Sequence, residues 1–317
     1  MKKLVYVLVF GLSIWLLTLS PNHLITLSPV AYAGGVGTTG AQFLKIGLGA
    51  RPVAMGGVYA GIADDVNAIY WNPAGLAQVS GKELTAQHIV WFQSINYEYF
   101  GYAHNLENLG TAGVMVNYLY MDDLEKRTGD TNEPDSYFGA SDLAITLAGG
   151  RKINDKLSLG CNLKFISQTI DTEKASGFAI DLGGLYTVDE KMKIGLAVQN
   201  LGTKIEFVSE SDPLPLNIKL GVGYKLLDNN LTLGLDINYP NDNNINFALG
   251  AEYIVKKIRG IILPLRVGYN TKATADLGSP GVGVGLGIIV NKFDFDFAWV
   301  PYGDLGQTYR LALKIKF

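Results

Sequence analysis

Apolar and polar residues alternate along the chain from residue 83 onward, which predicts β-strands whose two faces meet different surroundings. The final segment shows the pattern most plainly. One face is apolar throughout: Tyr309, Leu311, Leu313, Ile315 and Phe317. The other face carries Arg310, Ala312, Lys314 and Lys316. Segments of this kind predict about 14 strands, near residues 83–91, 95–104, 110–121, 140–152, 155–170, 176–188, 190–200, 215–226, 230–239, 244–255, 261–271, 280–290, 292–300 and 307–317.

The connections between these segments alternate in length. The two longest, 121–139 and 201–214, follow the third and seventh segments, whereas connections such as Asp189-Glu190 are tight. With both termini in the periplasm, this parity places the short turns inside and the long loops outside, as in outer-membrane barrels. The predicted fold class is therefore all-β: a 14-stranded antiparallel transmembrane outer-membrane β-barrel over residues 83–317.

A secreted β-sandwich also alternates apolar and polar residues, but three features favour the barrel. The segments are about 10 residues long, which fits a tilted membrane crossing. Glycine is dense on the polar face, as at Gly221, Gly223 and 281–287, where a filled lumen needs small residues. Aromatic residues gather at segment ends, as at a membrane interface: Tyr224, Tyr239, Tyr253, Tyr269, Trp299, Tyr309 and Phe317.

The first residues resemble an export signal. Lys2 and Lys3 precede an apolar stretch over 4–17, and Ala31-Tyr32-Ala33 offers small residues at a signal-peptidase site. We therefore expect a signal peptide over residues 1–33. This segment is longer than usual, because residues 20–30, which contain Pro21, His23 and Pro29, separate the apolar stretch from the cleavage site. An uncleaved anchor is therefore the competing interpretation.

Composition removes several function classes. Charged residues make up 17% of the chain, against roughly 25% in average globular proteins, and the net charge of −3 argues against nucleic acid as a partner. One cysteine and three histidines make a structural metal site improbable, and we expect no cofactor. Gly35-Val36-Gly37-Thr38-Thr39-Gly40 matches the dinucleotide-binding glycine pattern but follows no strand. His88 and His104 have no nucleophile at a recognisable spacing, so we do not expect an enzyme.

Residues 34–82 interrupt the alternation, and their Gly- and Ala-rich sequence predicts helix only in short pieces. Three runs stand out: 37–47, 49–57 and 63–75, the last ending Tyr-Trp-Asn-Pro-Ala-Gly. Together with the run Trp-Val-Pro-Tyr-Gly-Asp-Leu-Gly at 299–306, they resemble the PorV/PorQ-type proteins, a branch of the FadL-like outer-membrane barrels. The piece Asn72-Pro73-Ala74 is shared more widely with FadL itself.

This resemblance implies that residues 34–82 fold back into the lumen as a hatch, and a lumen of this width does need more than strand side chains to fill it. The motif residues carried over are Arg51, Asp64, Asp65, Asn72, Pro73, Ala74 and Gly75. Their expected partners are charges on the polar strand face: Lys193, Lys219, Asp236, Arg266 and Arg310. We favour structural hydrogen bonds over ligand contacts for these residues. The terminal Phe317 resembles the signal that barrel-assembly machinery recognises.

The resemblance supports two functional hypotheses for a protein of the bacterial outer membrane. One is an accessory or shuttle component of type IX secretion, with loops 121–139 and 201–214 contacting secreted cargo or secretion-system proteins. The other is a FadL-like passive transporter of hydrophobic small molecules such as long-chain fatty acids. A purely structural outer-membrane protein is a third possibility. In each case the outward face contacts outer-membrane lipid.

Overall fold

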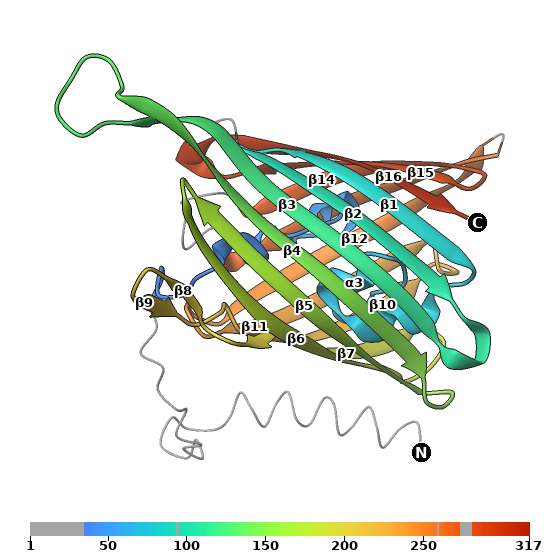
Figure 1. Cartoon of the computed structure of the whole chain (residues 1–317). Helices are drawn as coiled ribbons and strands as arrows, with labels where there is room; N and C mark the ends of the chain where they lie inside the picture. Colours follow the sequence, from blue (N-terminus) through green and yellow to red (C-terminus); the bar gives the residue numbers. More distant parts are fainter. Residues whose placement is uncertain (1–34, 93–94, 259, 273–280) are drawn as a thin grey trace, which may run out of the picture. The chain divides into compact units, whose positions relative to one another are not determined.

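The computed structural model of the protein describes residues 35–92, 95–258, 260–272 and 281–317. The expected signal peptide over 1–33 lies outside the described residues. Fourteen antiparallel strands close into a barrel, in which each strand pairs with its neighbours along the chain and β1 pairs with β16 (Figure 1). The barrel strands are β1 (Lys82–Val90), β2 (Asn96–Asn105), β3 (Thr111–Lys126), β4 (Ser136–Lys152), β5 (Leu157–Ile170), β6 (Glu173–Thr187), β7 (Met192–Gly202), β10 (Asn217–Leu226), β11 (Leu231–Pro240), β12 (Asn246–Ile258), β13 (Ile261–Asn270), β14 (Val282–Val290), β15 (Phe293–Pro301) and β16 (Gln307–Lys316).

The two ends of the barrel differ. One end, which we call the loop end, carries the connections β1–β2, β3–β4, β5–β6, β7–β10, β11–β12, β13–β14 and β15–β16. The opposite end, the turn end, carries the remaining connections together with the start of β1 and the end of β16. The 201–214 connection at the loop end contains a small separate sheet of β8 (Ile205–Phe207) and β9 (Glu210–Asp212). The short 3₁₀ helices η3 (Glu107–Leu109) and η4 (Gly303–Leu305) lie in the β2–β3 and β15–β16 connections.

The expected loop over 121–139 is wrong as a loop. Strands β3 and β4 continue through it to Lys126 and from Ser136, with a register shift between Met121 and Leu124, and form a hairpin that projects beyond the other strands (Figure 1). Both faces of this extension are solvated, so its sequence needs no apolar row and the alternation that marks the other strands is absent. Only residues 127–135 remain as its tip.

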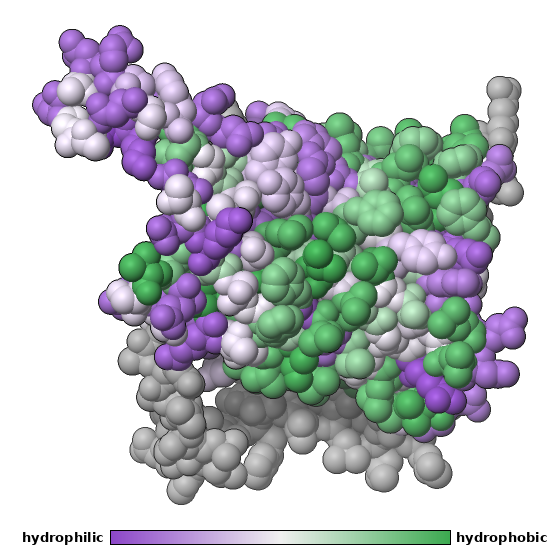
Figure 2. All heavy atoms as spheres, viewed as in Figure 1, coloured by the Kyte–Doolittle hydropathy of each residue, from purple (hydrophilic) through white to green (hydrophobic). Residues whose placement is uncertain are grey.

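The outward face of the barrel is apolar. Each of the fourteen strands exposes at least one large hydrophobic side chain, such as Leu182, Leu249 and Phe295. On the face seen in Figure 2, hydrophobic residues gather over the strands of the wall. Cys161 is exposed on β5 between Leu159 and Leu163, as the alternation predicts. An exposed apolar surface of this extent marks contact with lipid or protein.

The N-terminal segment, residues 35–81, runs along the inside of the barrel wall. It contains η1 (Gln42–Lys45), α2 (Ala50–Ala54), α3 (Ala68–Trp71) and η2 (Pro73–Gln78), and its short helices agree with the sequence prediction. Thr39 contacts Asp242 at the loop end, whereas the side chain of Asn105, at the turn end, donates to the carbonyl of Val79. The segment therefore passes from the loop end to the turn end before β1 begins.

The expectation that both termini lie at the same end needs correction. Phe317 lies at the turn end, where it pairs with Lys82, but the first described residues lie at the loop end. Alternation reports on strands alone, and the direction in which the N-terminal segment crosses the interior depends on long-range contacts.

Glycines on the strands allow the N-terminal segment to approach the wall. A Cβ built on Gly195 would lie 1.8 Å from the carbonyl oxygen of Ala60, and one built on Gly268 would lie 2.0 Å from the backbone nitrogen of Gly56. Real Cβ atoms do not come so close, so larger residues at these positions would push backbone against backbone. The glycine-rich polar face thus has the steric role that the sequence suggested.

Candidate functional site inside the barrel

Arg51 on α2 is the centre of a buried charge cluster that joins the N-terminal segment to the wall. Its guanidinium binds both carboxylate oxygens of Glu252 on β12, each at 2.9 Å, and it also donates to Asp64 and to the Tyr59 hydroxyl. Bidentate pairs of this kind are among the strongest charge-assisted hydrogen bonds in proteins. The cluster therefore ties residues 51–64 to the middle of a wall strand.

The cluster continues along the wall through Arg266 on β13. Arg266 Nε lies 2.6 Å from a Glu252 oxygen, and Arg266 Nη1 lies 2.6 Å from Asp296 on β15. The side chain of Arg266 is 3% exposed. Its charge is thus compensated entirely inside the protein, on both sides.

A second cluster surrounds Asp65. Lys314 on β16 lies 2.8 Å from Asp65 and 3.1 Å from Asp294, and Arg51 reaches Asp65 at 3.4 Å, so the two clusters are joined. Glu83 on β1 accepts a hydrogen bond from the Val66 backbone at 2.8 Å. These contacts hold the N-terminal segment against the strands where the barrel closes.

Asn72 shapes the turn that begins η2. Its side-chain oxygen accepts from the Ala74 backbone at 3.1 Å, while its amide donates to the carbonyls of Ala60 and Gly184. Pro73 and Ala74 lie against wall glycines: a Cβ on Gly160 would meet the Pro73 carbonyl carbon at 2.3 Å. Gly75 has no room for a side chain either, because a Cβ there would lie 2.5 Å from that of Ala63. The Asn-Pro-Ala-Gly run is thus a cap and a close-packing device.

Asp242, in the β11–β12 connection, holds the start of the N-terminal segment at the loop end. It accepts hydrogen bonds from Thr39 at 2.6 Å and from Lys45 at 2.7 Å. Burial alone raises the pKa of this carboxyl, but the hydrogen bonds from Lys45 and Thr39 outweigh burial, so the pKa lies below its ordinary value. The contact is therefore present at neutral pH.

A cavity of about 470 Å³ lies between the N-terminal segment and the wall. Its lining includes aromatic rings, amides and cations, among them Trp71, Trp91, Gln199, Asn217, Lys219 and Arg310. Lys219 lies 3.7 Å from Asp236, which also accepts hydrogen bonds from the backbone of Tyr59 and Ala60. The cavity has the size of ordinary small-molecule sites.

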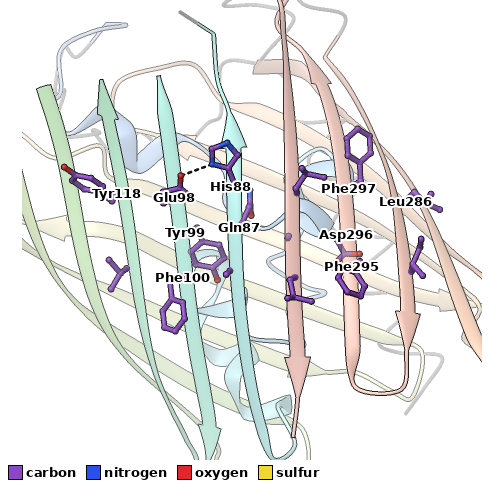
Figure 3. A pocket seen from close by; sticks show the side chains of 16 residues that line it. Gln87, His88, Glu98, Tyr99, Phe100, Tyr118, Leu286, Phe295, Asp296 and Phe297 are labelled. Atoms are coloured by element: carbon purple, nitrogen blue, oxygen red, sulfur yellow. Dashed lines mark hydrogen bonds and ion pairs between the residues drawn. The ribbon is translucent and has the colours of Figure 1, made fainter. Parts of the chain in front are cut away.

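A second cavity, of about 610 Å³, is a groove on the barrel wall where β1 and β16 meet (Figure 3). Its apolar lining includes Phe100, Phe295 and Phe297. Its polar feature is a hydrogen bond between exposed side chains, with His88 Nδ1 2.8 Å from Glu98 Oε1. A hydrogen-bonded imidazole and carboxylate on an otherwise apolar outward face are unusual for a surface in contact with lipid.

The structure brings together most of the expected interior residues. Arg51, Asp64 and Asp65 share one cluster, Arg266 joins it, and Lys219 pairs with Asp236. Lys193 instead contacts Gln78, and Asn72 contacts backbone rather than charge. The direct partners that sequence reasoning missed are Glu252, Lys314, Asp294, Asp296 and Glu83. All five lie on the polar face of an alternating segment, which was the available signal.

Phe317 ends the chain next to β16. Its side chain is 62% exposed, its backbone nitrogen donates to the Lys82 carbonyl at 2.9 Å, and Lys292 Nζ lies 5.3 Å from its ring centroid.

Within the described ranges, no helix is long and apolar enough to cross a membrane, and no group of three or more His, Cys, Asp or Glu side chains could hold a metal ion.

A closed barrel with a polar, filled interior and an apolar exterior defines a class, and solved structures share its fold. The toluene transporter TbuX of Ralstonia pickettii aligns with a TM-score of 0.59 and 14% identity, covering 86% of this chain and 98% of that one. The CymD monoaromatic hydrocarbon channel gives the same TM-score, identity and coverage. A FadL homologue of Pseudomonas aeruginosa aligns with a TM-score of 0.54 and 11% identity, over 84% of this chain and 97% of that one. The fold is that of the FadL-type outer-membrane channels.

The family model for PorV, described as type IX secretion system protein PorV, matches residues 32–240. The protein therefore belongs to the PorV family. No curated protein is significantly similar to it in sequence.

Proposed function

We propose that the protein is an outer-membrane accessory or shuttle component of type IX-like protein export, in which the loop end contacts secreted proteins or other secretion components. The observation that carries this proposal is the PorV family match over residues 32–240, which includes the N-terminal segment, the β3–β4 hairpin and the 201–214 connection. The protruding β3–β4 hairpin and the 201–214 connection are the partner surfaces. The apolar outward face rests in outer-membrane lipid.

Residues 34–82 act in this proposal as a hatch that closes the lumen, after removal of a signal peptide over 1–33. Support comes from the length of the N-terminal segment, which reaches both ends of the barrel, and from its charge pairing with wall strands. Arg51, Asp64, Asp65 and the Asn72–Gly75 turn hold the hatch in place rather than contact a ligand. Phe317 serves as the barrel-assembly signal.

The partner surfaces are tested by removing the tip of the β3–β4 hairpin. Residues 127–135 are replaced by an Asn-Gly turn, and proteins that copurify with the tagged barrel from native cells are identified by mass spectrometry. Secreted or secretion-system proteins should be lost from the variant. A matched control replaces residues 153–156 at the turn end in the same way and should keep them. The proposed partner surface would be rejected if both variants copurified the same amounts of these partner proteins. It would also be rejected if neither the variants nor the wild type copurified any of them.

The orientation is tested by cysteine labelling in intact cells. Cys161 is first replaced by Ser, and Val36, which is 74% exposed at the loop end, is replaced by Cys. A membrane-impermeant maleimide should label Val36→Cys in intact cells. The control, Asp155→Cys at the turn end, should react only after the outer membrane is broken. The reverse pattern would contradict the proposed placement of the loop end outside.

The second candidate function is passive transport of hydrophobic small molecules, and the groove at the β1–β16 junction favours it. Ala86 lines this groove, so Ala86→Trp should fill it. Uptake of radiolabelled oleate should fall in the variant if the groove is part of a route. Uptake that is the same with the wild type, with the variant and without the gene would reject the transport function and leave the export proposal unaffected.

A further inference from the structure

Arg310 differs from every other buried charged side chain in the described part of the chain. All the others lie within 4.0 Å of an opposite charge, as Lys164 does with Asp181 and Lys314 with Asp65. Arg310 on β16 is 0% exposed and has no such partner among the described residues. A buried cation without a counter-ion is costly, so proteins rarely keep one without a reason.

The hydrogen bonds of Arg310 leave one edge of its guanidinium open. Nη1 donates to Thr308 at 3.0 Å and Nη2 lies 3.5 Å from the Tyr302 hydroxyl, but Nε has no acceptor. An arginine edge formed by Nε and a terminal nitrogen matches the two oxygens of a carboxylate. The open edge thus fits an anion that is not part of the described chain.

Arg310 lies in the wall of the 470 Å³ cavity, beneath aromatic rings. Its Cζ is 5.5 Å from the Trp91 ring centroid, and the Trp91 and Tyr302 rings are 5.0 Å apart. An anion bound to Arg310 would therefore lie next to the Trp91 ring. Binding would change the fluorescence of Trp91.

Two other polar oxygens that line the same cavity have no hydrogen-bond donor among the described residues. Asn217 Oδ1 and Asp242 Oδ1 are buried without a donor, and the two residues line the same cavity as Arg310, from β10 and from the β11–β12 connection. Gln199 and Trp71 add an amide and a flat ring. Amide and carboxylate oxygens together with ring faces are the groups that bind hydroxylated molecules.

We propose that this cavity binds a small organic anion that also carries hydroxyl groups, with its carboxylate on the open edge of Arg310. The hydroxyls donate to Asn217 and Asp242, and the ring face of the ligand packs on Trp91, the ring beside Arg310. This site does not depend on whether the loop end binds secreted proteins. It also differs in chemistry from a route for hydrocarbons.

The test uses three probes on the full-length protein purified in detergent, with binding measured by calorimetry and tryptophan fluorescence. D-glucuronate carries both the carboxylate and hydroxyls, D-glucose lacks the carboxylate, and hexanoate lacks the hydroxyls. D-glucuronate should bind and change the fluorescence, and each of the other two should bind at least about tenfold more weakly. Trp91→Phe should remove most of the fluorescence change while D-glucuronate still binds.

Two variants at Arg310 separate binding from folding. Arg310→Met removes an unpaired charge, so the barrel should keep its heat-modifiable migration while binding of D-glucuronate is lost. If this variant does not fold, Arg310→Lys keeps the charge but lacks the planar edge and should weaken D-glucuronate binding. Unchanged binding of D-glucuronate by whichever Arg310 variant folds would overturn the proposal. Equal binding of all three probes by the wild type would also overturn it, as would no binding of any probe at concentrations up to about 10 mM.

A control addresses the one carboxylate that lies outside the described residues, Asp276. If Asp276 supplied the counter-ion of Arg310, the Asp276→Asn variant would bind D-glucuronate more tightly than the wild type, because the competing carboxylate would be gone. The proposal requires unchanged affinity in this variant. Tighter binding would show that Arg310 is paired within the chain.

Discussion

Replacing Arg266 with Met should cost the barrel far more stability than replacing an exposed lysine. Arg266 is the sole cation within 4.0 Å of Asp296 among the described residues, and it also contacts Glu252. Its loss leaves Asp296, which is 8% exposed, as a buried and unpaired carboxylate, while Glu252 keeps Arg51. Removal of one partner of a buried pair costs about 3–5 kcal/mol, and we expect Arg266→Met to lower the free energy of unfolding by that amount.

The measurement is guanidinium unfolding of the detergent-folded barrel followed by tryptophan fluorescence, with heat-modifiable migration as the check of folding. Lys152→Met is the matched control, because the Lys152 pair with Asp155 is exposed, and it should change the free energy by less than about 0.5 kcal/mol. The double variant Arg266→Met/Asp296→Leu removes both charges and should recover most of the loss. A loss below about 1 kcal/mol for Arg266→Met, or no recovery in the double variant, would refute the view that charge pairing inside the barrel holds it together.

Two further predictions concern the N-terminal segment. Gly195→Ala should impair assembly of a heat-modifiable barrel, because the added Cβ would lie 1.8 Å from the Ala60 carbonyl oxygen. The control Gly184→Ala should assemble normally, because the nearest atom to its added Cβ is 3.9 Å away. Equal yields of folded barrel from the two variants would contradict this packing. The contact between Asp242 and Lys45 should resist acid, because the pKa of Asp242 is lowered in the folded protein. The stability that this contact contributes is fully present above the ordinary carboxyl pKa of about 3.9, and it is lost only as the pH falls below that pKa. Acid-stable protease should therefore cleave the start of the segment only below about pH 4, whereas Asp242→Asn should be cleaved at pH 4–7 as well, and cleavage of the wild type at pH 5 would contradict this.

Local patterning was enough to predict the barrel wall. Strands such as 217–226 and 307–316 fall close to their predicted positions, because outward-facing and inward-facing side chains alternate with a period of two residues. This period can be seen in the sequence. The pattern ends where its physical cause ends. The β3–β4 hairpin projects beyond the apolar outward face, so its residues show no alternation and the sequence predicts a loop there.

The interior depended on tertiary structure. The sequence showed that Arg51, Asp65 and Arg266 would need partners, but the choice of Glu252 and Lys314 follows from strand register and from the path of the N-terminal segment between the two ends. These pairs are about 200 or more residues apart in the chain, and alternation contains no information on such distances. The same holds for Arg310. Its place on a polar face was visible in the sequence, but its lack of a described counter-ion appears only when the closed barrel brings the other buried charges together in pairs.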